Sequence, residues 1–135
     1  LQLLNVAYGG TLTQDIPTQL PQALAHRVPG RYEKHLHAVD IVPGTRLAQL
    51  YPGQTRVTTN SIHHQAIKTV APDFVVEAIC PDDGVVEAVR WRGPGYVAGV
   101  QWHPEFHDPG DPATLDDRPM LNDFLAAARA AKTAD

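Results

Sequence analysis

The sequence contains little of several features that mark common classes of protein. It has one cysteine, Cys80, so a disulfide within the chain is excluded, which fits a reducing cytosol. No apolar run approaches the roughly 20 residues of a membrane-spanning helix, and the first residues lack the pattern of a signal peptide. The 11 basic residues are scattered and the net charge is −4, which disfavours binding to nucleic acid or to a membrane surface. We therefore expect a cytoplasmic protein without nucleic-acid or membrane partners.

The overall composition is that of a globular domain. Hydrophobic residues make up 43% of the 135 residues and charged residues 19%, a balance that is not typical of a disordered chain. The length suffices for one small domain. The only methionine is Met120, and the sequence begins with Leu1. We therefore expect the sequence to be the internal part of a longer chain.

Alternation between helical and strand periodicity predicts a mixed α/β domain. We expect a short helix over residues 1–7, a loop with one helical turn over 11–34, and a short helix that Thr45 caps, ending at Leu50. Strands are expected over residues 35–41, 56–60, 74–79, 85–91 and 96–102, with a hairpin turn at 81–84 and a turn or short helix at 61–68. The last strand is mostly apolar, which predicts burial on both faces. An exposed acidic loop over 106–118 and a final helix from Pro119 complete the prediction.

The sharpest chemical signal is His103-Pro-Glu105, which follows the last predicted strand. One imidazole nitrogen can accept a proton from a thiol or hydroxyl while the other donates to the carboxylate, which fixes the tautomer. Ligands of open α/β sheets bind at the carboxyl ends of strands, where this pair is expected to lie. The alternative is a histidine and a glutamate on a solvated loop, because so short a motif recurs by chance.

A second polar segment, from Asn60 to Gln65, follows another predicted strand. Its backbone N–H groups and side chains can bind a zwitterionic substrate head group. From the residues alone, a short helix capped by Asn60 or Ser61, with exposed histidines, is the favoured interpretation.

Seven histidines raise the question of a metal site. His35 and His37 share one face of a predicted strand, but the sequence has no H-E-x-x-H motif and no pair of cysteines, so we expect no metal. Cys80 ends a predicted strand and follows no glycine-rich elbow. We therefore interpret it as a structural thiol and not as a nucleophile.

Four segments together resemble the class I glutamine amidotransferases, most closely the peptidase C26 branch typified by γ-glutamyl-γ-aminobutyrate hydrolase. They are residues 1–16 (LQLLNVAYGGTLTQDI), 57–67 (VTTNSIHHQAI), 83–88 (DGVVEA) and 99–105 (GVQWHPE). The segments keep the family's order and spacing, so the four matches together are far more specific than any one of them. Thr59 stands where the family often has Val, which is a minor departure.

The resemblance implies a flavodoxin-like fold, a three-layer sandwich of the α/β class with helices on both faces of a mostly parallel sheet. Residues 1–135 would be the C-terminal portion of this single domain, and the N-terminal part with the nucleophilic cysteine would be missing. In the family that cysteine stands three residues before the position that Leu1 matches.

The resemblance also implies roles for individual residues. His103 matches the general base of the family, and Glu105 matches the acid that orients it. Gln2 matches a residue at the substrate pocket. Asn60, Ser61 and His63 match a segment near the γ-glutamyl head group. No cofactor is implied.

The activity that follows is hydrolysis of γ-glutamyl amide bonds in a small molecule by a Cys-His-Glu triad, with this chain inactive by itself. One alternative is the glutaminase component of an ammonia-transferring amidotransferase, and another is a non-catalytic fragment or binding module. The missing part would leave one sheet edge and one apolar helix face uncovered. We therefore expect the chain to need that part or a second chain, or to form a homo-oligomer.

Overall fold

The computed structural model describes residues 1–133, apart from the side chain of Glu33. The helices are α1 (Gln2–Ala7), α2 (Ile16–Gln19), α3 (Arg46–Leu50) and α4 (Arg118–Lys132), with the short 3₁₀ helices η1 (Tyr32–Lys34) and η2 (Pro104–Phe106). The strands are β1 (Thr11–Thr13), β2 (Leu36–Ile41), β3 (Arg56–Asn60), β4 (Ala66–Thr69), β5 (Phe74–Ile79), β6 (Val86–Trp91) and β7 (Ala98–Val100). The chain is therefore a mixed α/β structure, as its periodicity predicted.

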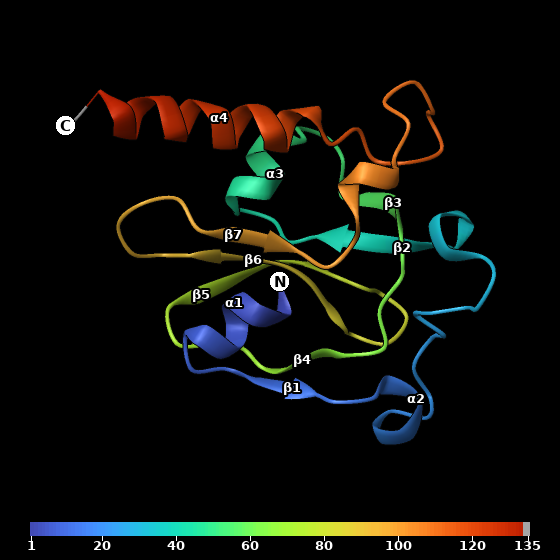
Figure 1. Cartoon of the computed structure of the whole chain (residues 1–135). Helices are drawn as coiled ribbons and strands as arrows, with labels where there is room; N and C mark the ends of the chain where they lie inside the picture. Colours follow the sequence, from blue (N-terminus) through green and yellow to red (C-terminus); the bar gives the residue numbers. More distant parts are fainter. Residues whose placement is uncertain (134–135) are drawn as a thin grey trace.

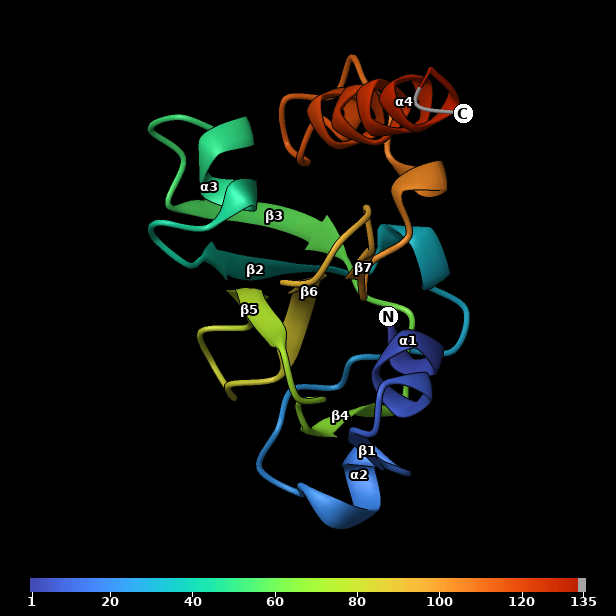
Figure 2. The ribbon, with the colours of Figure 1, turned by 90° about the vertical axis from the view of Figure 1, so that its left-hand side faces the viewer.

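The strands form two sheets. A five-stranded sheet has the order β3-β2-β5-β6-β7, and β1 pairs with β4 in a separate two-stranded ribbon. Helices α3 and α4 cover one face of the large sheet, and α1 with the β1–β4 ribbon lies on the other face (Figures 1 and 2). All the strand pairings of residues 1–133 are antiparallel, so the mostly parallel sheet that the resemblance implied is not present in this part of the chain.

Several element boundaries follow from local chemistry. The Thr45 hydroxyl accepts a hydrogen bond from the Ala48 N–H and caps α3, as predicted. Gly84 has a φ of 75°, which the hairpin turn between β5 and β6 requires and which a residue with a Cβ rarely adopts. Pro119 lies in the first turn of α4, which begins at Arg118, one residue before the predicted start.

Three predictions from periodicity are wrong. Residues 61–65 form no helix, so neither Asn60 nor Ser61 is a helix cap, and residues 66–68 belong to β4, which pairs with β1 inside the predicted loop 11–34. The strand expected over 96–102 is shortened to β7, which is half-buried and pairs only with β6, so it is not buried on both faces. The loop 106–118 is not simply exposed, since Leu115 is buried and its N–H donates to the Thr58 carbonyl.

Two apolar cores lie on opposite faces of the large sheet. Under α3, residues such as Val39, Leu47 and Trp102 pack together. Under α1, Phe74 and Val89 form a second cluster, and the ring of Tyr8 packs against the rings of Phe74 and Trp91. Burial of one side chain of this size contributes roughly 1.5–3 kcal/mol, so these two clusters hold the layers together.

Helix α4 presents part of its apolar stripe to solvent. Leu121 and Phe124 are 55% and 50% exposed, whereas Met120 packs against the core under α3. A cavity of about 510 Å³ lies between α4 and strands β6 and β7, and Leu121 and Phe124 contribute to its lining. Asp123 of α4 accepts hydrogen bonds from Arg46 of α3, so a polar pair also anchors this helix. Among residues 1–133, no helix is long and apolar enough to cross a membrane.

Candidate active site

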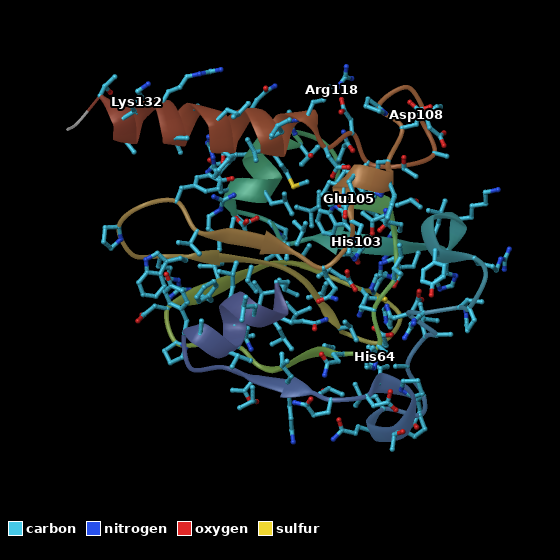
Figure 3. All side chains as sticks on the ribbon, viewed as in Figure 1. His64, His103, Glu105, Asp108, Arg118 and Lys132 are labelled. Atoms are coloured by element: carbon cyan, nitrogen blue, oxygen red, sulfur yellow. The ribbon has the colours of Figure 1, made fainter. Side chains whose placement is uncertain are left out.

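His103 and Glu105 lie side by side on the segment that follows β7 (Figure 3). The Nδ1 of His103 is 2.9 Å from Oε1 of Glu105, and this hydrogen bond lowers the pKa of the Glu105 carboxyl. Pro104 lies between them and opens the 3₁₀ helix η2, which turns the glutamate back toward the imidazole. The side chains are 42% and 61% exposed, so a substrate can reach them. The pair has the geometry in which a carboxylate fixes the tautomer of a basic imidazole.

Asn60 holds this histidine through its backbone. The Asn60 side chain donates from Nδ2 to the His103 carbonyl at 2.7 Å and accepts at Oδ1 from the His103 N–H at 2.8 Å. Asn60 is fully buried at the end of β3. The end of β3 and the start of the His103 segment are therefore fixed to each other.

The start of the chain lies against the strand that carries His103. A Cβ placed on Gly99 of β7 would stand 3.1 Å from the Cα of Leu1, which is tighter than an ordinary van der Waals contact, so the glycine favours this close approach of the two segments. Figures 1 and 2 both show the N-terminus beside β7. A cavity of about 420 Å³ is lined by residues 1–3 and 100–104, and His103 and Gln2 both contribute to it.

The other predicted binding residues point into the protein. Gln2 donates from Nε2 to the Gln65 carbonyl at 3.2 Å, which joins it to the polar segment after β3. Ser61 is buried, with its hydroxyl bonded to the His26 carbonyl, and His63 is buried with Nδ1 2.9 Å from the Gln65 carbonyl. The expectation that these histidines are exposed holds for His64 but not for His63. A role for Asn60, Ser61 or His63 at a substrate head group stays a prediction.

His107 was not among the predicted site residues, although it lies beside them. Its Nδ1 is 2.5 Å from Oδ2 of Asp117, and its Nε2 accepts from the Asn60 N–H at 3.2 Å. The other oxygen of Asp117 accepts from the indole N–H of Trp102. These contacts attach the loop after η2 to the segment that carries His103. No local sequence signal predicts them, because the partners are joined only by the fold.

A buried polar cluster lies behind the polar segment. It consists of His26, His37, His63 and Glu87, which are 2%, 8%, 6% and 0% exposed. Burial lowers the pKa of His37 to about 3 and that of His63 to about 4, and it raises the pKa of Glu87 to about 8. The donor atoms of His26, His63 and Glu87 all lie within 4.8 Å of one another. We expected no metal from the spacing of the histidines, but the fold gathers three of the seven around one carboxylate.

Cys80 has the environment of a structural thiol. It is fully buried, and burial raises the pKa of its thiol to about 12. A nucleophilic cysteine needs the opposite, an accessible site that stabilises the thiolate.

The sequence of the chain is similar to those of several known proteins. Residues 1–105 match the model of the peptidase C26 family. Over 107 residues the chain is 42% identical to protein NtpR of Enterococcus hirae, covering 78% of this chain and 44% of that protein. It is 40% identical over 113 residues to the γ-glutamyl-γ-aminobutyrate hydrolase of Escherichia coli (strain K12), covering 79% of this chain and 43% of the hydrolase. The chain thus spans less than half the length of these relatives.

One solved structure has the same fold as the whole chain. It is a Thermoplasma acidophilum protein assigned as part of a GMP synthase, with a TM-score of 0.67, 14% identity, and coverage of 98% of this chain and 55% of that one. At this identity the match concerns the fold alone.

Proposed function

Because this chain belongs to the peptidase C26 family, we propose that it carries the His103-Glu105 pair of a cysteine-dependent hydrolase of γ-glutamyl amide bonds. The observation that carries the proposal is the 2.9 Å hydrogen bond between His103 and Glu105, with His103 at a cavity that residues 1–3 also line. The name of the Escherichia coli relative supplies the substrate class, γ-glutamyl-γ-aminobutyrate.

In the proposed reaction the thiol comes from polypeptide that precedes Leu1. His103 takes the thiol proton at Nε2 while its Nδ1–H donates to the Glu105 carboxylate, which stabilises the imidazolium. The thiolate attacks the γ-carbonyl carbon, and His103 returns the proton to the departing amine as the C–N bond breaks. A water molecule, deprotonated by the same imidazole, then hydrolyses the thioester and releases glutamate and the thiol.

The contacts of His103 support a role as the base. Two hydrogen bonds to the Asn60 side chain fix the backbone of His103, and the hydrogen bond to Glu105 fixes its ring. Nε2 is therefore the nitrogen left for proton transfer. The backbone of Leu1 packs closely against Gly99 of β7. A residue shortly before Leu1 therefore emerges near the same cavity.

The test uses the full-length protein, including the residues before Leu1, with γ-glutamyl-γ-aminobutyrate as substrate and glutamate release as the readout. His103→Ala is expected to lower kcat by about 10⁴-fold, the scale on which triad members act. Glu105→Gln is expected to lower it by about 10²-fold or more, because the ring loses its orienting charge. Lys132→Ala is the control, since Lys132 is exposed and lies far from the pair, near the end of α4 (Figure 3).

Two outcomes would contradict the proposal. Near wild-type turnover in His103→Ala, with the fold intact by circular dichroism, would remove the base from the mechanism. Activity on glutamine alone, increased by a synthase partner, would replace the hydrolase with the glutaminase alternative while leaving the same pair in place.

A further inference from the structure

The buried cluster around Glu87 has the arrangement of a coordination site. Its members come from four separate parts of the chain: His26 from the loop after α2, His37 from β2, His63 from the segment after β3, and Glu87 from β6. Oε1 of Glu87 is 3.6 Å from Nε2 of His63 and 3.9 Å from Nδ1 of His26, and Oε2 is 3.7 Å from Nε2 of His37. These separations are too long for hydrogen bonds, which need about 2.7–3.2 Å.

The same separations suit donor atoms that share a cation. With metal–ligand bonds of about 2.0–2.2 Å, the donors of a tetrahedral zinc ion lie roughly 3.3–3.5 Å apart. The three observed distances exceed this by a few tenths of an ångström. The donor atoms of His26, His63 and Glu87 also all lie within 4.8 Å of one another, whereas no such group among the described residues includes His37.

The cluster also leaves buried polar atoms unpaired. Both oxygens of Glu87, both ring nitrogens of His37 and Nε2 of His63 have no hydrogen-bond partner among the described residues. Each unpaired buried polar atom costs about 1–3 kcal/mol, and buried polar groups in native proteins are nearly always satisfied. One cation between His26, His63 and Glu87 would satisfy the unpaired Nε2 of His63 and an oxygen of Glu87.

The outer contacts orient the rings as metal ligands require. Nδ1 of His63 faces the Gln65 carbonyl at 2.9 Å and Nε2 of His26 faces Oδ2 of Asp83 at 2.7 Å. Ligating histidines almost always donate their second nitrogen to a carbonyl or a carboxylate in this way. Nδ1 of His26 lies 2.9 Å from Ser61 Oγ, whose hydroxyl also donates to the His26 carbonyl at 3.1 Å, so a metal at Nδ1 would replace the contact with Ser61.

We propose that His26 Nδ1, His63 Nε2 and the Glu87 carboxylate bind a zinc ion in a buried, structural site, with His37 beside the second oxygen of Glu87. Imidazole and carboxylate are donors that zinc accepts. We assign a structural role because all three ligands are buried. The ion would join the loop after α2 to strand β6 and to the segment that follows β3.

A second group of potential ligands shares one histidine with this site. His26, Cys80 and Asp83 also have donor atoms within 4.8 Å of one another. Asp83 already accepts hydrogen bonds from the N–H groups of Leu24 and Val85, so both of its carboxylate oxygens have partners in and beside the hairpin. Replacement of Cys80 therefore distinguishes the two sets of ligands.

The experiment measures zinc in untagged full-length protein that has been stripped with a chelator and then incubated with Zn²⁺. Elemental analysis is expected to give one zinc per chain, with a higher Tm than the stripped protein. Incubation with Co²⁺ instead is expected to give the strong visible absorption of a four-coordinate cobalt ion. Glu87→Gln, which keeps the side-chain volume, is expected to lower zinc affinity at least about 100-fold, and His63→Gln is a second variant of the same kind.

Control variants define what would overturn the site. Cys80→Ala and His64→Ala are both expected to retain one zinc per chain. Wild-type protein that takes up no zinc and shows no Tm shift would refute the site outright. Zinc retained in Glu87→Gln but lost in Cys80→Ala would assign the metal to the other group. None of these readouts depends on hydrolytic activity, so the result stands apart from the proposed function.

Discussion

Asn60 bonds to both the N–H and the carbonyl of His103, at 2.8 Å and 2.7 Å, through one side-chain amide. A side-chain amide can donate and accept in this fork while remaining uncharged at neutral pH. The position of the candidate base is therefore set from a different strand, β3, and not only from the strand that precedes it.

Asn60→Ala is expected to reduce both stability and turnover of the full-length protein. The change leaves two backbone groups of His103 without partners, which costs about 2 kcal/mol or more. Displacement of the imidazole is expected to lower kcat by about 100-fold. Chemical denaturation and glutamate release measure the two effects. Asn122→Ala, an exposed change on α4, is the control and should shift the free energy of unfolding by no more than about 0.5 kcal/mol.

Gly10→Ala is expected to destabilise the β1–β4 ribbon. A Cβ at Gly10 would lie 2.3 Å from the side-chain amide of Asn5. That amide is buried and bonds to the carbonyls of Thr11 and Thr69 and to the N–H of Ala71, so it cannot move aside without losing these bonds. We expect a loss of about 1–3 kcal/mol, read from thermal or chemical unfolding. Gly110→Ala, whose nearest neighbour is the tip of an exposed aspartate side chain, should have little effect.

Cys80 is expected to resist alkylation in the folded protein. Its thiol is fully buried and its pKa is raised to about 12, so only about one molecule in 10⁴ carries a thiolate at pH 8. Iodoacetamide labelling, followed at the Cys80 peptide by mass spectrometry, should be at least about 100-fold slower than in denaturant. Rapid labelling in the native state would mean that β5 and β6 open far more often than their packing suggests.

Asp123→Asn is expected to change how stability depends on pH. The hydrogen bond from Arg46 is the main cause that lowers the pKa of Asp123 below its unfolded value of 3.8. The pair therefore stabilises the fold above pH 3.8, and this contribution is lost as the pH falls through the lower, folded pKa. Because Arg46 is 47% exposed, the effect is about 1 kcal/mol or less. The difference between wild type and variant should vanish in acid, whereas Asp82→Asn, at an exposed position, should show no such trend.

The elements that sequence reasoning could predict are those with local signals. The Thr45 cap, the glycine of the 81–84 turn and the proline in the first turn of α4 each act on their immediate neighbours. Strands β1 and β4 carry no comparable signal. They become strands because they pair with each other across more than 50 residues, with Leu12 opposite Ile67, and such pairing is decided by tertiary structure.

The same distinction applies to the sites. His103 and Glu105 are two residues apart, so a short motif could identify the pair before its geometry was known. His107 and Asp117 meet across a loop, and Glu87 meets three histidines from three other segments. In a β-strand the spacing of ligands along the sequence says little about which faces converge, so the absence of a zinc motif was weak information.

The end of β3 and the residues that follow it contact both candidate sites. Asn60 reaches toward His103, while the next residues, Ser61 and His63, reach into the group around Glu87. Substitutions in the cluster around Glu87 and at Asn60 should therefore show epistasis. The double variant should change turnover by a factor that differs from the product of the two separate effects. Directed evolution of the full-length protein toward a substrate with a different leaving amine is then expected to select substitutions at interior positions as well as at positions that line the cavity.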